Sequence, residues 1–83
     1  MLFTISDGSK KEINAGNFVK IKGDFIPPYF LDVQIPVTKI DSGYPFVHFY
    51  KEESYQDEFD EIRTKVVCDE ESAVSPELIL EVF

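Results

Sequence analysis

The sequence has little of the chemistry on which most catalytic and metal sites depend. Among 83 residues it contains a single cysteine, Cys68, and a single histidine, His48. One cysteine excludes an internal disulfide, which fits a reducing compartment such as the cytoplasm. A zinc site needs about four ligands, and one His with one Cys supplies them only with the help of several carboxylates. We therefore expect a cytoplasmic protein that is not an enzyme and holds no metal or cofactor.

His48 and Cys68 do have the residue types of a thiol nucleophile and its base. Nothing in the sequence places them together, and no oxyanion-hole signature accompanies them. A lone His in an apolar run, such as 46–50, is more often a core or interface residue than a base. Cys68 is most simply a small buried apolar residue.

Long apolar runs and basic clusters are also scarce. No stretch approaches the roughly 20 apolar residues of a membrane span, and the apolar start 1–6 lacks the basic residues of a secretory signal. The chain contains eight Lys and Arg residues and sixteen Asp and Glu residues. Nucleic acid and anionic lipid would both be repelled without a basic stripe. We expect no membrane and no direct nucleic-acid binding.

The chain is rich in hydrophobic residues, and its acidic residues are concentrated in one region. Hydrophobic residues make up 43%, with eight Phe and four Tyr, so we expect one folded domain over 1–83 with one small core. Residues 1–50 carry five Lys and five Asp or Glu, whereas residues 51–83 carry three Lys or Arg and eleven Asp or Glu. The formal charge of -8 therefore lies in the last third of the chain.

Two interpretations of the acidic run remain open: a solvated stretch that keeps the protein soluble, or a carboxylate array that imitates the phosphates of nucleic acid. The run lacks the Asp-x-Asp-x-Asp-Gly order of an EF-hand, so a specific calcium site is disfavoured. In the second interpretation the array pairs with Lys and Arg of another protein. The candidate partner-binding residues are Glu52, Glu53, Tyr55, Asp57, Glu58, Phe59, Asp60, Glu61, Asp69, Glu70 and Glu71.

Alternation of apolar residues predicts short strands in the first fifty residues. Asp7-Gly8 predicts a β-hairpin with a two-residue turn between arms 2–6 and 9–13, with Phe3 and Ile5 on one face. Val19 and Ile21 alternate with lysines in a half-buried strand over 18–22. Further strands are expected over 29–40, bent at its proline and lying at a sheet edge, and over 46–50. Only one of Tyr29 and Phe30 is expected to be buried.

Residues 51–68 allow two structures. In one, Ser54 caps an acidic helix over 54–66. In the other, a solvated loop over 51–61 leads into a strand over 62–68, with Ile62, Thr64, Val66 and Cys68 on one face. The β-branched content of 62–67 favours the strand.

The carboxyl-terminal residues predict a loop over 69–72 and then a short helical turn that begins at Ser75-Pro76. The apolar end, 78–83, is expected to dock on the core or on a partner. The fold class is therefore mostly β: a small SH3-like barrel or a rolled antiparallel sheet of four to five strands with a short helical turn. The alternative is α+β with the acidic helix.

The expected function is that of a protein-binding domain whose carboxylates face a basic, nucleic-acid-binding protein. An inhibitor or adaptor encoded by a phage or mobile element is the sharper form of this hypothesis. The alternative is a structural module, a homo-oligomer assembled through the edge strand at 29–40 and the apolar end at 78–83.

Overall fold

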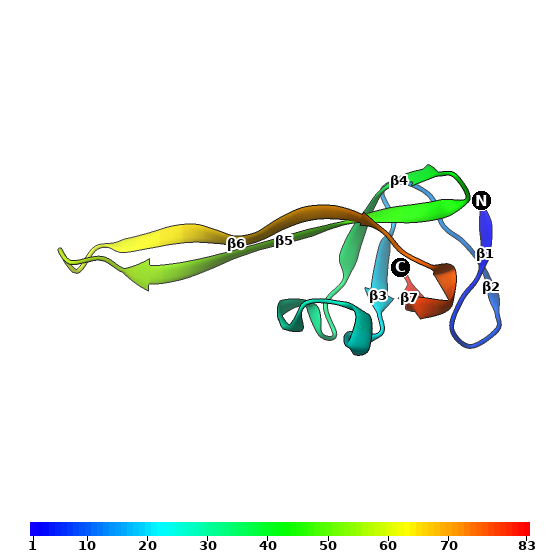
Figure 1. Ribbon diagram of the computed structural model, residues 1–83, viewed down its shortest axis with the longest axis horizontal. Coiled ribbons are helices and arrows are strands. Elements are labelled where there is room, and N and C mark those ends of the chain that lie inside the picture. Colours follow the sequence, from blue (N-terminus) through cyan, green and yellow to red (C-terminus); the bar gives the residue numbers. More distant parts are fainter.

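The computed structural model describes all residues, 1–83, and is mostly β, with 55% of residues in strands. Five antiparallel strands in the order β6-β5-β4-β3-β7 form a curled half-barrel, and β1 and β2 form a separate hairpin beside it (Figure 1). The elements are β1 (Leu2–Thr4), β2 (Lys10–Glu12), β3 (Phe18–Ile21), η1 (Gly23–Phe25), η2 (Pro28–Phe30), β4 (Ile35–Asp41), β5 (Tyr44–Gln56), β6 (Ile62–Ala73), η3 (Pro76–Leu78) and β7 (Ile79–Val82). The only helical segments are the three 3-10 turns, none of which has the length or apolar character to span a bilayer.

The molecule has two parts of different shape (Figure 1). Strands β5 and β6 run side by side far beyond the other strands, and we call their outer part, residues 50–69, the arm and the rest of the chain the body. The molecule measures 52 × 21 × 18 Å, with a radius of gyration of 15.2 Å. A compact chain of this length would have a radius of about 12 Å. The difference reflects the projecting arm.

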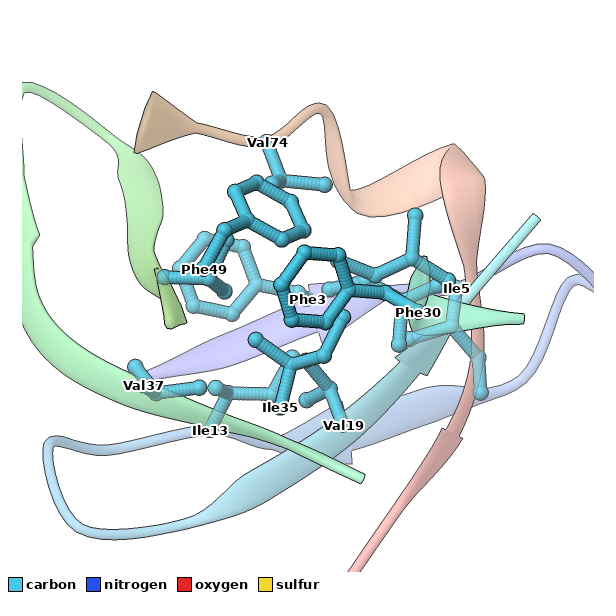
Figure 2. Close-up of a cluster of buried hydrophobic side chains, with 12 residues drawn as sticks. Phe3, Ile5, Ile13, Val19, Phe30, Ile35, Val37, Phe49 and Val74 are labelled. Atoms are coloured by element: carbon cyan, nitrogen blue, oxygen red, sulfur yellow. The ribbon is translucent and has the colours of Figure 1, made fainter. Parts of the chain in front are cut away.

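The core lies wholly in the body. Figure 2 shows buried side chains of the sheet and of the amino-terminal hairpin converging on one cluster. The Phe30 and Phe49 rings pack 5.1 Å apart, which joins the loop before β4 to the sheet. Full burial of each large apolar side chain contributes roughly 1.5–3 kcal/mol before entropy is counted. The cluster contains Phe3, Ile5, Ile13, Val19, Ile21, Phe30, Ile35, Val37, Val47, Phe49, Val74 and Ile79.

The amino-terminal hairpin is confirmed, but its turn is longer than predicted. Phe3 pairs with Lys11, and both Phe3 and Ile5 are buried. The Ile5 N–H donates to the Ser9 carbonyl, and the Gly8 N–H to the Ile5 carbonyl, so three residues form the loop. Gly8 takes a φ of 84°, as the last residue of such a loop requires. The prediction for β3 is also confirmed, with Val19 and Ile21 buried.

The prediction of one strand over 29–40 is wrong in its first half. The Phe30 N–H donates to the Pro27 carbonyl in a 3-10 turn, and Asp32 has a φ of 58°, so the chain becomes extended only at Ile35. Phe30 is buried and Tyr29 is exposed, as expected, although the cause is the turn and not strand alternation. Strand β4 lies between β3 and β5 and is therefore not an edge of the sheet.

The alternative of an acidic helix over 54–66 is wrong, and so is the loop predicted over 51–61. Strand β5 continues to Gln56, and only 57–61 forms the turn. The strand predicted over 62–68 is confirmed but extends through the predicted loop at 69–72 to Ala73. Continuous pairing with β5 explains this extension, because it satisfies backbone groups that a loop would leave to water.

The carboxyl terminus docks on the body, but the expected helical turn is only a 3-10 turn. Pro76 occupies the first turn of η3, as predicted, while Ser75 makes no side-chain capping hydrogen bond. Strand β7 follows at once and pairs with β3, with Ile79 fully buried. Leu80 and Phe83 remain exposed.

Candidate functional site

The arm begins where β5 loses its second neighbour. Strand β4 pairs with β5 only as far as Val47, and beyond that residue β6 is the sole partner of β5. Phe49 is the last buried side chain on β5, and none of residues 50–69 is buried. Beyond its base, where the partly buried Cys68 packs against the core cluster, the arm is therefore a two-stranded ribbon with no layer packed against either of its faces.

A bulge interrupts the ladder near the base of the arm. Lys51 pairs with Cys68, whereas the next residue, Glu52, pairs with Val66, so Val67 has no partner. One extra residue on one strand reverses the alternation beyond it and increases the local twist. The prediction that Cys68 shares a face with Ile62, Thr64 and Val66 is therefore wrong.

The register assigns each arm residue to one of two faces, because residues directly opposite in an antiparallel pair share a face. The inner face continues the side of the sheet that carries the buried Phe49, and the outer face continues the side that carries His48. The inner face carries Lys51, Glu53, Tyr55, Arg63, Lys65 and Cys68. The outer face carries Tyr50, Glu52, Ser54, Gln56, Ile62, Thr64, Val66 and Asp69.

All three basic residues of the arm lie on its inner face, and two of them have local partners. The Arg63 Nε lies 2.5 Å from the Asp57 carboxylate, and an Arg63 terminal nitrogen lies 3.4 Å from that of Glu61. The Lys65 Nζ lies 5.8 Å from the centre of the Tyr55 ring, a cation–π contact. The Arg63 ion pairs offset part of the positive charge of the inner face, whereas the Tyr55 ring leaves the charge of Lys65 in place.

The outer face has carboxylates and no basic residue. The Tyr50 hydroxyl donates to the Glu52 carboxylate, and this hydrogen bond, partial burial and the charges of Glu52 and Asp69 raise the pKa of Tyr50 above its ordinary value. At the base of the arm, the His48 Nε2 lies 2.6 Å from the Asp69 carboxylate. Next to it, Glu71 accepts a 2.9 Å hydrogen bond from the Thr38 hydroxyl.

The tip of the arm is built around Asp57. Its carboxylate accepts hydrogen bonds from the N–H groups of Phe59 at 2.8 Å and Glu61 at 3.0 Å. Partial burial opposes ionisation of Asp57, but the Glu61 N–H, the Arg63 guanidinium and the Phe59 N–H outweigh it and lower the pKa of this carboxyl. The turn follows the same backbone hydrogen-bond pattern as residues 5–9, with Asp60 at a φ of 60° in the position that Gly8 occupies there.

The structure thus places nine of the eleven predicted partner-binding residues on the arm, but divides them between its two faces and its tip. Tyr55 lies on the inner face, and Phe59, with 74% of its side chain exposed, lies at the tip, so the two aromatics do not form one patch. The Asp57 carboxylate is hydrogen-bonded within the turn and does not face outward. Glu52 and Asp69 lie on the outer face, Glu53 on the inner face, Glu58, Asp60 and Glu61 in the tip, and Glu70 and Glu71 just below the arm.

The apolar residues of the outer face are not among the partner-binding residues predicted from the sequence. Ile62 is 77% exposed and Val66 is 53% exposed, and Tyr50 lies further along the same face with 46% exposure. The sequence predicts Ile62, Thr64 and Val66 on one face of a strand but gives no sign that this face is uncovered. Alternation shows that residues share a face, but not whether anything covers that face.

The structure does not bring together the residues considered as a thiol nucleophile and its base or as metal ligands. His48 and Cys68 lie on opposite faces of the β5–β6 ladder. Partial burial and the charges of Glu70 and Asp69 raise the pKa of the Cys68 thiol, which leaves it a poor nucleophile. No group of three or more His, Cys, Asp or Glu side chains is placed to hold a metal ion.

The comparisons with known proteins add no family to this description. The chain matches no protein-family model, no curated protein and no solved structure. The arm and its two unlike faces are therefore the features from which a function is argued.

Proposed function

We propose that this protein is a small non-enzymatic binding domain whose arm presents carboxylates to a basic surface on another protein. The supporting observation is that seven Asp or Glu and only three Lys or Arg lie within residues 50–69, on a ribbon that extends away from the body. Two of those three basic residues have local partners. Arg63 offsets part of the charge through Asp57 and Glu61, and the three basic residues together leave four of the seven negative charges unbalanced and available to an external partner.

Physical arguments favour a protein partner over nucleic acid. A net charge of -8 repels phosphates, and the basic residues needed to offset that repulsion are absent from the outer face. Carboxylates on a projecting ribbon pair well with Lys and Arg and accelerate encounter with a basic protein. A two-stranded ribbon is also marginally stable in water, so contact with a partner would stabilise it.

The sharper proposal is an inhibitor or adaptor of a nucleic-acid-binding protein, encoded by a phage or mobile element and acting in the cytoplasm. In this role the carboxylates of the arm occupy a groove that otherwise receives phosphates. For the body, the SH3-like barrel expected from the sequence stays a prediction, supported by its short antiparallel strands and curled sheet.

The test is to neutralise the arm without disturbing its turn. Glu52, Glu53, Glu58 and Glu61 are changed to Gln, while Asp57 is kept because it holds the tip. Binding to proteins retained from the native host is then measured from low to high salt. We expect binding to fall steeply for this variant and to weaken with salt for the unchanged protein.

The matched control removes the same amount of charge from the body. Asp24 and Asp41 are changed to Asn, and Glu77 and Glu81 to Gln; all four residues are exposed and lie outside the arm. This variant should keep its binding. Equal losses in the two variants, or binding indifferent to salt, would contradict the proposal.

The alternative function is a homo-oligomeric module. Strand β4 does not offer an edge, so the support left for this alternative is the pair of exposed apolar residues Leu80 and Phe83 beside β7. Sedimentation over a range of concentrations tests it. A dimer that dissociates when Leu80 and Phe83 are changed to Ser would favour assembly over partner binding.

A further inference from the structure

The outer face of the arm combines two properties that rarely occur on a solvated strand. The first is exposed apolar area: Ile62, Val66 and Tyr50 lie along it with no second layer to cover them. Strand residues of this kind normally pack on a core, and an uncovered apolar ribbon is a surface that attracts other chains.

The second property is the sign of the charge around those side chains. Glu52 lies directly opposite Val66 on the neighbouring strand, and Asp69 lies directly opposite Tyr50. The inner face, in contrast, carries Lys51, Arg63 and Lys65. The two faces therefore differ in charge as well as in apolar content.

We propose that the outer face of the arm, from the Tyr50–Asp69 pair to the Gln56–Ile62 pair, is a docking face for a basic protein segment with apolar residues between its charges. This inference rests on the proposed function and specifies which face binds and what it binds. Apolar side chains of the segment pack on Ile62 and Val66, and its Lys or Arg side chains pair with the carboxylate of Glu52. The face spans seven residues of β5, from Tyr50 to Gln56, or roughly 20 Å, which matches an extended segment of about seven residues.

Charge complementarity selects this occupant over two others. A second copy that docks through the same face would bring carboxylates and no Lys or Arg to Glu52 and Asp69, so it offers them no opposite charge. Nucleic acid would bring phosphates against a face that has no basic residue. A basic and partly apolar protein segment satisfies both properties of the face.

The experiment compares two labelled octapeptides with four lysines each, one alternating Lys with Val and the other alternating Lys with Ser. Binding to the full chain is measured by fluorescence anisotropy over a range of salt. We expect the Lys-Val peptide to bind about tenfold more tightly, because only its valines gain apolar contact with the arm.

Two variants locate the contact. Ile62→Thr with Val66→Thr removes apolar area but keeps the β-branched shape that strands favour. Both side chains are largely exposed, so the fold should persist, and the far-ultraviolet circular dichroism spectrum checks it. This double variant should lose the preference for the Lys-Val peptide. The control Tyr55→Thr, on the inner face, should keep the preference.

The outcomes separate this inference from the proposed function. If both peptides bind equally in a salt-dependent manner and the double variant changes nothing, the proposed function is supported but the docking face is overturned. If Tyr55→Thr abolishes the preference for the Lys-Val peptide, the inner face controls binding and the docking face is also overturned. If neither peptide binds at low salt, the carboxylate arm does not recognise basic chains and both proposals fail.

Discussion

The body and the arm are made in part from the same two strands, yet different forces hold them. In the body, β5 contributes Val47 and Phe49 to a cluster of twelve buried hydrophobic side chains. In the arm, the same strand continues for seven more residues without burying one. Backbone pairing with β6 continues through both parts, so hydrogen bonding does not distinguish them. Burial does, and the arm should therefore open without unfolding the body.

The largest expected difference between the parts is in amide hydrogen exchange. Backbone amides of β3 and of β5 residues 44–49 should exchange only through global unfolding, which costs a few kcal/mol in a domain of this size. Amides of residues 52–66 should exchange through local opening of the ribbon, about a thousandfold faster. Exchange followed by NMR measures both sets. Equal protection in the two parts would mean that the arm folds as part of the core.

The next effect is the cost of removing buried side chains. Ile79 is fully buried, so Ile79→Ala should lower the free energy of unfolding by about 2–5 kcal/mol. If this variant does not fold, Ile79→Val should still cost about 0.5–1.5 kcal/mol. The matched change in the arm, Ile62→Ala, should stay within about 0.5 kcal/mol. Urea denaturation followed by circular dichroism compares them, and a large effect of Ile62→Ala would show that the arm has a hidden packing partner.

A smaller difference in stability is expected between substitutions in the turns at the two ends of β5. Gly43, in the body turn between β4 and β5, has a φ of 81° and open space around it, so Gly43→Ala should cost about 1 kcal/mol through backbone strain alone. Asp60 at the arm tip also has a positive φ. Changing Asp60→Gly relieves its strain but should leave the midpoint of urea unfolding unchanged, because the arm opens first. A shift of that midpoint by Asp60→Gly would show that the two parts unfold together.

The smallest effect is the pH response of the arm tip. The folded pKa of Asp57 lies below its ordinary value of 3.8, so the carboxylate stabilises the turn above that pH, and this contribution is lost as the pH falls through the lowered pKa. The amide signals of Phe59 and Glu61 should then lose dispersion below about pH 4. Hydrogen bonds from the Ser9 hydroxyl and the Ser9 backbone N–H also lower the pKa of Asp7, but burial of Phe3 and Ile5 should retain its hairpin.

The control for this titration is Asp57→Asn, which removes the ionisable group. Its tip amides should not show the loss of dispersion that follows protonation of Asp57. Loss of dispersion at residues 5–9 together with the tip would mean that acid unfolds the whole chain and that the two parts are not independent.

Local patterns predicted much of the body and part of the arm. The hairpin around Asp7-Gly8, the alternation of Val19 with Ile21 and the strand over 46–50 are short-range signals, and all three are confirmed. The strand over 29–34 was predicted wrongly because its alternation was real but its proline pair began a 3-10 turn. The alternative helix over 54–66 does not form, because a capping pattern and a favourable charge order do not outweigh pairing of β-branched residues across two long strands.

What the sequence alone determined is which residues alternate, where the tight turns fall and that the acid is concentrated after residue 50. These properties depend on neighbours a few positions away, so local chemistry is sufficient to set them. Only the tertiary structure decided that β5 extends past its last contact with β4, and that the bulge at Val67 moves Cys68 to the face opposite Ile62. The physical reason is that a face becomes a core or a binding surface according to what packs on it, and here the strands that could cover the arm end before they reach it.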